Sequence, residues 1–365
     1  MSISNEVRIA VMPGDGIGEE IMAPCLELVN QAAGLAGGFS LGYDHIEAGA
    51  GLYLRTGEDL PKSALEGARA ADAILLGAMG LPDVRYPDGR EIVPQIDIRE
   101  ELDLYAGIRP VRTFPGLPVP LADPRAQNLE LILIRESTEG LFAERTKPQE
   151  HDDMGVDKMI VTRPASERLF KFAFKLTERR KQQGKEGRLT CVDKANVLGS
   201  MAFFRSVFDE IAAGHPEITA DHCYVDAMAL KLIRNPWDND VLVTENMFGD
   251  ILSDAGAALM GGMGMAPSAD IGDDNAVFQP CHGTAPDIAG TGKANPSAMI
   301  LSAAMMLDWL GDTMDSDAMR DAGRMLDAAV LAAFSTGDLV PYEMGGNAGL
   351  KPITDRVSAM LNKVS

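Results

Sequence analysis

The chain has 365 residues, a length that suits two domains or one large α/β unit. Its apolar content of 46% and charged content of 24% are typical of a globular protein, and its apolar runs are too short to span a membrane. The net charge of −21 opposes nucleic-acid binding, although local arginines could still hold small anions. We therefore expect neither nucleic acid nor membrane as a partner.

The N-terminus and the cysteines indicate the compartment. The sequence MSISNEVRIAVMPGDG lacks a basic segment followed by an apolar stretch, so no export signal is recognised. The cysteines are scattered and form no CxxC or Cys/His metal pattern. They are Cys25, Cys191, Cys223 and Cys281. Such residues are typical of small buried side chains in a reducing cytoplasm, which is the expected location.

Strand and helix patterns alternate along the chain. Strands are predicted at residues 7–12, 73–76, 129–134, 189–192 and 241–244. Helices are predicted at 19–33, 165–183 and 201–213, and in the C-terminal third at 297–309, 317–334 and 353–364. This alternation predicts an α/β fold with a mainly parallel sheet.

Two polar segments interrupt the pattern. Residues 79–95 are rich in glycine, proline and charge and are expected to form a mobile loop. Residues 145–157 are similarly polar and are expected to form an arm. Because neither has the composition of a linker, a second domain is expected to be inserted into the first.

The turn at residues 13–18, PGDGIG, only partly matches a nucleotide-binding loop. The GxGxxG pattern needs glycine at position 19, where Glu19 stands, so a simple strand-to-helix turn is the more plausible interpretation. A second glycine-rich loop begins at His282. Its acidic residue, Asp287, could accept hydrogen bonds from ribose hydroxyls, although ordinary loop chemistry is equally compatible.

Asp250 and Asp254 are four residues apart after a predicted strand, so both carboxylates should lie on one helix face. Such a pair can be a solvated surface. However, the helix is otherwise apolar and is predicted to be buried, where unpaired carboxylates would be costly. A hard divalent cation, Mg²⁺ or Mn²⁺, would relieve that cost.

Basic residues supply the complementary chemistry. Arg99, Arg109 and Arg135 could hold the carboxylates of a small acid, or each could form a surface ion pair. Arg135 follows a strand, where α/β sheets place ligands. Lys194 also follows a strand and could act as a base, or could simply pair with a neighbouring acid such as Asp193.

Taken together, these motifs resemble the metal-dependent β-decarboxylating dehydrogenases that act on isocitrate, isopropylmalate and tartrate. The resemblance runs through PGDGIG, ELDLYAGIRP, RESTEG, VDKANVL, YVDAMA, NMFGDILSD and HGTAPDIAGTGKANP, which cover nearly the whole chain. It is closest overall to isopropylmalate dehydrogenase-like members. It implies a two-domain fold without Rossmann topology. The large domain would comprise residues 1–104 and 261–365, and residues 105–260 would form the inserted small domain with the dimer interface.

The resemblance also implies residue roles. The substrate would contact Arg99, Arg109, Arg135, Gln95 and Ile96. The metal ligands would be Asp250, Asp254 and, from the other subunit of a homodimer, Asp226. Lys194, also from the other subunit, would assist removal of the hydroxyl proton. The cofactor would contact His282, Ala285, Asp287, Asn295 and Asn196, and the Asp287-Ile288 pair favours NAD over NADP.

Two departures from the family pattern concern the protonation step and the substrate specificity. Phe142 stands where the family has the tyrosine that helps protonate the enolate. The enzyme would then protonate the enolate slowly, use another donor such as Glu139 or a bound water, or act on a substrate that needs no such proton. Ile92 and Val93 replace polar residues that distinguish the isopropylmalate and isocitrate branches. With Ile96 they could shelter an alkyl group, whereas Gln95 adds a polar contact.

The sequence therefore predicts NAD- and metal-dependent oxidation, with β-decarboxylation, of a malate-type 2-hydroxy dicarboxylate such as 3-isopropylmalate. One alternative is a tartrate or D-malate dehydrogenase. The other is a non-catalytic regulatory paralogue, which Phe142 would explain.

Overall fold

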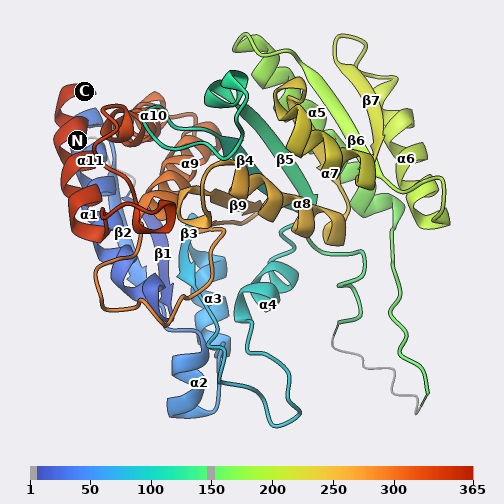
Figure 1. The fold of residues 1–365 in the computed structure, drawn as a ribbon. Coiled ribbons are helices and arrows are strands. Elements are labelled where there is room, and N and C mark those ends of the chain that lie inside the picture. The colour runs from blue at the N-terminus through green and yellow to red at the C-terminus, as the bar shows by residue number, and fades with distance from the viewer. Residues whose placement is uncertain (1–5, 146–152, 365) are drawn as a thin grey trace.

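A single ten-stranded sheet runs through the molecule (Figure 1). The structure, a computed structural model, describes residues 6–145 and 153–364. The strands are β1 (Glu6–Gly14), β2 (Ser40–His45), β3 (Ala73–Ala78), β4 (Ala106–Arg112), β5 (Glu130–Glu136), β6 (Arg188–Asp193), β7 (Thr219–Tyr224), β8 (Val241–Thr244), β9 (Pro267–Ile271) and β10 (Ala276–Pro280). Their order is β2-β1-β3-β10-β9-β4-β5-β8-β6-β7, which differs from the Rossmann order.

The sheet divides into two halves at the β9–β4 pairing. Strands from both ends of the chain form one half, and β4 to β8 form the other. The three central pairings, β10–β9, β9–β4 and β4–β5, are antiparallel, and the outer pairings are parallel. The mainly parallel α/β sheet is therefore confirmed. The two-domain boundaries that we propose follow the same division.

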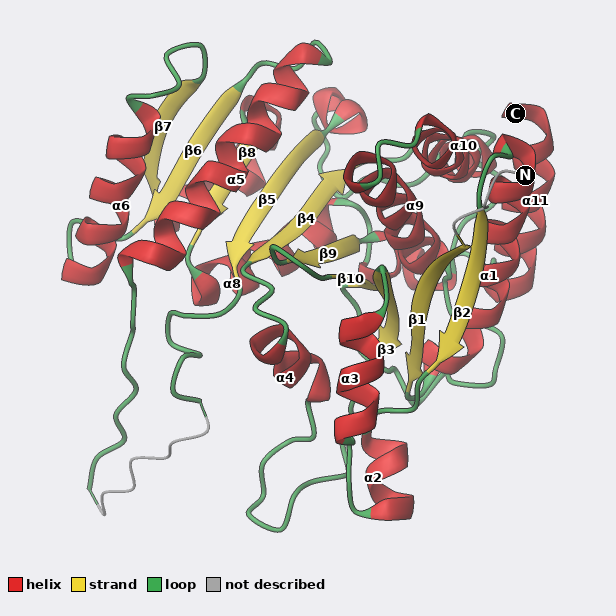
Figure 2. Ribbon diagram, turned by 180° about the vertical axis from the view of Figure 1, so that it is seen from behind, coloured by secondary structure: helices red, strands yellow, loops and turns green. Residues whose placement is uncertain are grey.

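Helices cover both faces of the sheet. They are α1 (Ile17–Ala36), α2 (Ala50–Thr56), α3 (Lys62–Ala70), α4 (Pro94–Glu101), α5 (Arg163–Gln182), α6 (Gly199–Ala212), α7 (Val225–Arg234), α8 (Asn246–Leu259), α9 (Ser297–Thr313), α10 (Asp317–Phe334) and α11 (Leu350–Val364). In the half formed by β4 to β8, α7 and α8 cover the face seen in Figure 1, and α5 and α6 cover the face seen in Figure 2. In the other half, α1 and α9 pack on β3.

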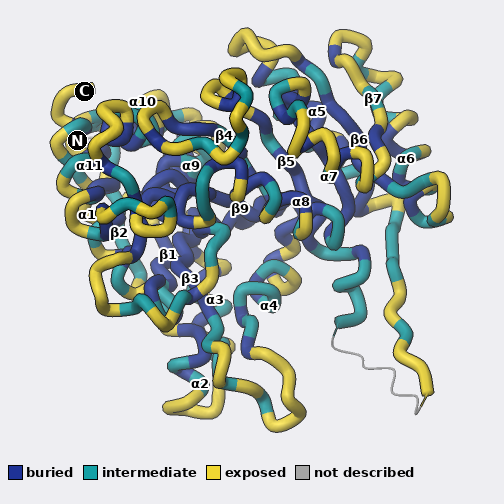
Figure 3. Tube along the Cα trace, in the orientation of Figure 1, coloured by how far each residue is buried: buried dark blue, intermediate teal, exposed yellow. Residues whose placement is uncertain are grey.

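Alternation of side chains along the strands explains why both faces need cover. In β1, Ile9 and Val11 belong to the main apolar core, and Ala10 and Met12 belong to a smaller core on the opposite face. All four are buried, as the dark interior of Figure 3 illustrates. This pattern matches strands that are covered on both sides.

The PGDGIG segment forms a strand-to-helix turn, as expected. Gly14 and Gly16 have φ of 77° and 59°, values that favour glycine. Asp15 is buried, and its carboxylate accepts hydrogen bonds from the backbone N–H groups of Ala50, Gly51 and Gly80 at 2.7–2.8 Å. The aspartate therefore holds three loops together.

All five predicted strands and all six predicted helices are present; β8 and α10 have the predicted ends, and the others are shifted at one or both ends. The sequence did not identify β2, β4, β7, β9 or β10. The predicted loop at 79–95 ends where α4 begins, at Pro94. Of the predicted arm at 145–157, residues 146–152 lie outside the described residues. Among the helices described, none is long and apolar enough to cross a membrane.

Candidate functional site

A cavity of about 180 Å³ lies where the two halves of the sheet meet. It is lined from both halves, by the end of β3, the loop after β10, and side chains of α4, β4, β5 and α8. Its polar and charged lining residues are Gln95, Arg99, Arg109, Arg135, Asp250, Ser253, Asp254, Ser268, Gln279 and His282. The three predicted arginines and the predicted acid pair thus share one cavity.

Asp270 on β9 holds two of the arginines. Its carboxylate accepts hydrogen bonds from Arg99 Nε and Arg109 Nη2, each at 3.0 Å, and also from Gln279 Nε2 at 2.9 Å. Its side chain is fully buried. Burial alone would raise the pKa of Asp270, but the charges of Arg109 and Arg99 outweigh it and lower the pKa to about 2. The arginines are therefore fixed before any ligand binds.

The third arginine is held from α8. Arg135 donates to Asn246 Oδ1 from Nε at 2.9 Å and from Nη2 at 2.6 Å, and it also pairs with Asp250. Burial, together with the positive charge of Arg99, lowers the pKa of Arg135 to about 10. Because the guanidinium groups that line the cavity repel one another, the cavity favours an anionic ligand with several carboxylates.

Asp250 and Asp254 lie on the cavity side of α8, but the helix is less buried than the sequence predicted. The Asp250 side chain is 50% exposed, and Ile251 is 61% exposed. The expectation of a buried helix is wrong for the isolated chain, because α8 is an outer layer of its half. Partial burial and the nearby charge of Asp250 raise the pKa of Asp254. A divalent cation fits this oxygen donor set and would offset that repulsion.

Lys194 and Asp226 form an ion pair with each other. Both residues belong to the half of the sheet formed by β4 to β8. Neither lines the cavity, and among the described residues Asp226 does not join Asp250 and Asp254 in one cluster. The loop that carries Lys194 is anchored by Asp193, which is buried and accepts hydrogen bonds from Arg205 at 2.7 and 2.8 Å. Within one chain, these two residues therefore lie apart from the rest of the predicted site.

Phe142 lies beside the arginine cluster. The Arg135 guanidinium carbon is 5.5 Å from the centre of the Phe142 ring. The predicted substitute acid, Glu139, is turned elsewhere, since its carboxylate accepts from Thr162 N at 2.8 Å and from the Thr162 hydroxyl. Glu139 thus supports the start of α5, and the structure gives it no role as a proton donor in the cavity.

The predicted specificity residues separate into two groups. Gln95 lines the cavity, whereas Ile92, Val93 and Ile96 do not. Ile92 is only 1% exposed and belongs to the protein interior. The expectation that these isoleucines and valine shelter a substrate alkyl group is therefore not supported.

The predicted cofactor residues differ in accessibility. His282 lines the cavity, and its Nε2 is buried without a partner among the described residues. Asp287 and Asn196 are exposed, and Ala285 is half-buried with a φ of 36°. Asn295 is buried, and its amide donates to Glu343 Oε1 at 2.7 Å. Contacts of these residues with a cofactor stay predictions.

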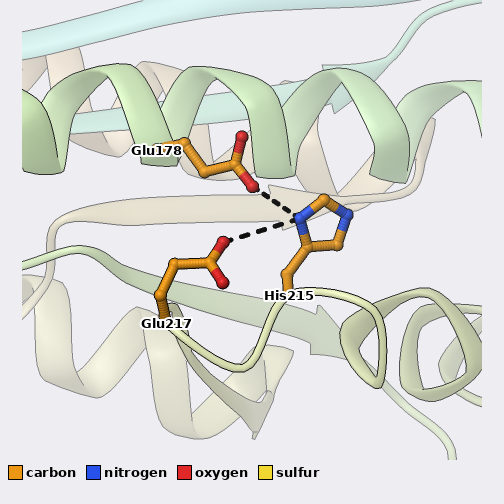
Figure 4. A group of neighbouring side chains, drawn as sticks. All are labelled: Glu178, His215 and Glu217. Atoms are coloured by element: carbon orange, nitrogen blue, oxygen red, sulfur yellow. Dashed lines mark hydrogen bonds and ion pairs between the residues drawn. The ribbon is translucent and has the colours of Figure 1, made fainter.

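A second acidic group lies away from the cavity. Figure 4 shows the carboxylates of Glu178 and Glu217 directed at the ring of His215. His215 Nδ1 is 2.6 Å from Glu178 Oε1 and 3.8 Å from Glu217 Oε1, and its ring stacks on Phe174. Hydrogen bonding and stacking account for this arrangement, but it can compete for divalent ions in binding experiments.

Sequence reasoning missed several residues of the cavity. Asp270 and Gln279 fix the arginines, and Asn246 orients Arg135. Asn246 lies within the acidic NMFGDILSD motif and could have been noted there. Asp270 gave no signal, because it follows a short run, PSA, that was not recognised as a strand.

Comparisons with known proteins agree with this architecture. The family described as isocitrate/isopropylmalate dehydrogenase matches residues 8–357. The chain is 41% identical over 347 residues to a 3-isopropylmalate dehydrogenase of Moorella thermoacetica, covering 92% of each protein. It is 37% identical over 366 residues to a homoisocitrate dehydrogenase of Methanocaldococcus jannaschii, covering 98% of each.

A solved structure extends the likeness to three dimensions. The isocitrate dehydrogenase of Methylococcus capsulatus superposes with a TM-score of 0.85 at 32% identity, covering 97% of this chain and 99% of that one. Sequence relatives and structure thus agree over nearly the whole length. The chain is an oxidatively decarboxylating dehydrogenase that belongs to the isocitrate/isopropylmalate dehydrogenase family.

Proposed function

We propose that this enzyme oxidises and decarboxylates a malate-type 2-hydroxy dicarboxylate with NAD⁺ and a divalent metal ion, Mg²⁺ or Mn²⁺. The observation that carries the proposal is the convergence of Arg99, Arg109 and Arg135 with two aspartates on one small cavity. Arginines bind carboxylates with fixed geometry, and the aspartates supply oxygen ligands for a hard cation. Relatives named 3-isopropylmalate dehydrogenase make that acid the first substrate to test.

The chain's own residues perform binding and orientation. The arginines would hold both carboxylates, so that the 2-hydroxyl faces Asp250 and Asp254. A cation held by these aspartates would supply Lewis-acid stabilisation of negative charge on the substrate oxygens. Because Asp270 keeps two guanidinium groups in place, little reorganisation is needed when the substrate enters.

The nicotinamide cofactor would lie along the loop that begins at His282. His282 lines the cavity; its Nδ1 lies 2.9 Å from Gly283 O, and its buried Nε2 has no partner among the described residues. NAD⁺ held along this loop would supply the hydride-acceptor chemistry for oxidation of the substrate alcohol. Exposed Asp287 would disfavour the 2′-phosphate of NADP by like-charge repulsion.

A homodimer would complete the site. Lys194 and Asp226 lie outside the cavity of their own chain, and the proposal assigns them to the cavity of the partner. The helices beside them expose large apolar side chains, including Leu230 at 55%, Ile233 at 64% and Ile251 at 61%. Burying these side chains against a second copy would be favourable.

A cytoplasmic location is part of the proposal. The four described cysteines are all free thiols, which suits a reducing compartment.

The test is NADH formation with Mn²⁺ and a panel of acids, namely 3-isopropylmalate, 3-methylmalate, D-malate, tartrate and isocitrate, with CO₂ measured in parallel. Formation of NADH and CO₂ from a malate-type acid supports the proposal. Binding of these acids without any NADH would instead identify a regulatory paralogue.

A further inference from the structure

The loop that begins at His282 contacts the first turn of α1. Near its start, Thr284 O accepts a hydrogen bond from Ile17 N at 2.8 Å. A Cβ on Gly16 would lie only 2.2 Å from Thr284 O, so glycine permits this close approach. Thr284 is buried, and its hydroxyl donates to Gly80 O at 2.7 Å. The start of the loop is therefore fixed to α1 by the main chain.

The end of the loop is held to α1 by a side chain. Glu20 Oε2 accepts a hydrogen bond from Gly290 N at 2.5 Å, which joins residues 270 positions apart. The other carboxylate oxygen, Glu20 Oε1, is buried and has no partner among the described residues. Gly292 O accepts from Leu350 N, at the start of α11, at 2.9 Å. Glu20 is thus the side chain through which α1 holds the end of the loop.

The middle of the loop is exposed and depends on these anchors. Asp287 lies midway between Thr284 and Gly290, and its side chain is exposed. Ala285 has a φ of 36°, in the left-handed region that a residue other than glycine rarely adopts. Such a conformation persists only where the surrounding contacts enforce it. Loss of one anchor should therefore let the loop leave the conformation described.

We propose that Glu20 is a positioning residue for the nicotinamide cofactor, because its contact with Gly290 keeps the loop around Asp287 in the conformation that binds the adenosine end. This inference rests on the proposed function, since it assumes that the cofactor lies along this loop. A loop that is already ordered loses less conformational entropy when a ligand binds. Glu20 does not line the cavity of the arginines, so it acts on cofactor affinity and not on the acid.

A second role of Glu20 must be separated from this one. An acidic side chain in the first turn of a helix also stabilises the helix through the partial positive charge of its N-terminus. Glu19 shares that position in the first turn of α1. It is exposed, and among the described residues it makes no hydrogen bond with the loop. Glu19→Ala is therefore the matched control.

The experiment measures NADH binding by fluorescence titration, which requires no turnover, in the wild type and in Glu20→Ala, Glu20→Gln and Glu19→Ala. Glu20→Ala should weaken NADH binding about tenfold, the lower end of the range for a hydrogen bond to a charged group. Glu20→Gln keeps an acceptor oxygen and should restore most of the affinity. Glu19→Ala should bind NADH as the wild type does.

Kinetics and hydrogen exchange locate the effect. With Mn²⁺ and the best acid, Glu20→Ala should raise the KM for NAD⁺ and leave kcat and the KM for the acid unchanged. Without ligands, residues 282–292 should exchange their amide hydrogens faster in Glu20→Ala than in Glu19→Ala, because only the first variant frees Gly290 N.

Three results would overturn the inference. They are unchanged NADH affinity in a folded Glu20→Ala protein, an equal loss in Glu19→Ala, and unchanged exchange in residues 282–292. If no acid yields NADH but the variants bind NADH in the expected order, the proposed reaction fails and the role of Glu20 stands. If the wild type does not bind NADH, the role of Glu20 is rejected together with the cofactor assignment.

Discussion

The carboxylate of Asp270 and the guanidinium of Arg109 form an ion pair that is shielded from water and joins the two halves of the sheet. Arg109 lies on β4 and Asp270 on β9, with 3.0 Å between Nη2 and Oδ1. Their side chains are 6% and 0% exposed. Removal of one member would leave a buried charge without its partner, which is strongly destabilising.

Asp270→Asn is therefore expected to lower the free energy of unfolding by about 3 kcal/mol. It should also raise the KM for the acid substrate, since Arg99 and Arg109 lose their anchor. Urea unfolding and steady-state kinetics measure the two effects. Asp274→Asn is the control. Asp274 is exposed and lies three residues after the end of β9, so this substitution should change neither quantity. Equal stability of the two variants would contradict the assigned role.

The same ion pair predicts a pH dependence. The pKa of Asp270 is about 2 in the folded chain, against an ordinary value of 3.8. The ionised carboxylate therefore makes its full contribution to the free energy of unfolding above about pH 4, and this contribution is lost as the pH falls through about 2. Unfolding free energies between pH 5 and 2 should fall less steeply in Asp270→Asn than in the wild type or in Asp274→Asn. Parallel profiles would disprove the linkage.

Asp250→Asn should abolish metal-dependent oxidation and leave the fold intact. Its affinity for Mn²⁺ should fall by roughly 100-fold, because the cavity loses a charged oxygen ligand. Calorimetry should be done in a His215→Gln background, which removes the competing group of Glu178, His215 and Glu217. Unchanged Mn²⁺ binding and turnover in that background would place the metal elsewhere.

Phe142→Tyr should accelerate the decarboxylating reaction. A phenol at this position, with the ring centre 5.5 Å from the Arg135 guanidinium carbon, would give the site an acid that the present chain lacks there. A positioned proton donor contributes about 100-fold or more, so a rise of at least about tenfold in kcat is expected on the best substrate. Phe142→Leu controls for altered packing. If the tyrosine variant is no faster, protonation depends on another group.

Complementation between inactive variants tests the shared site. Lys194→Ala and Asp250→Asn should each be inactive alone. If the two residues of one site come from different chains, random mixing during refolding should restore about a quarter of wild-type activity, because half of the dimers would carry one intact site of two. Mixing Asp250→Asn with Asp254→Asn should restore nothing. Absence of recovery in the first mixture would reject the shared site.

The sequence predicted the parts of the fold with strong local patterns. Strands such as β8 (Val241–Thr244) and helices such as α10 (Asp317–Phe334) carry clear periodicity or apolar runs, and they were located closely. By contrast, β2 is half-exposed, and the sequence of β9, PSADI, contains Pro, Ser and Asp in place of an apolar run, so neither has a local signal. Their positions depend on pairing with distant strands.

The site followed the same rule. Charged residues within recognisable motifs, such as Arg135 and Asp250, were found. Asp270 was not, because its importance comes from two arginines more than 150 residues away. Likewise, the burial of Ile92 depends on tertiary packing, so the sequence could not show that this side chain belongs to the protein interior and not to the cavity lining.

The seam between β4 and β9 consists of three residue pairs, and one of them joins Gly107 to Asp270. A side chain on Gly107 would meet Asp270 Oδ1 at 3.0 Å and Ser137 Oγ at 2.7 Å, so the backbone approaches closely there. Arg109 and Arg135 lie on β4 and β5, on one side of this seam, while Asp270, which holds Arg99, lies on β9 on the other side. Bending the molecule along this line would change the spacing of the guanidinium groups, and an acid that engages all three would hold the halves at a single angle.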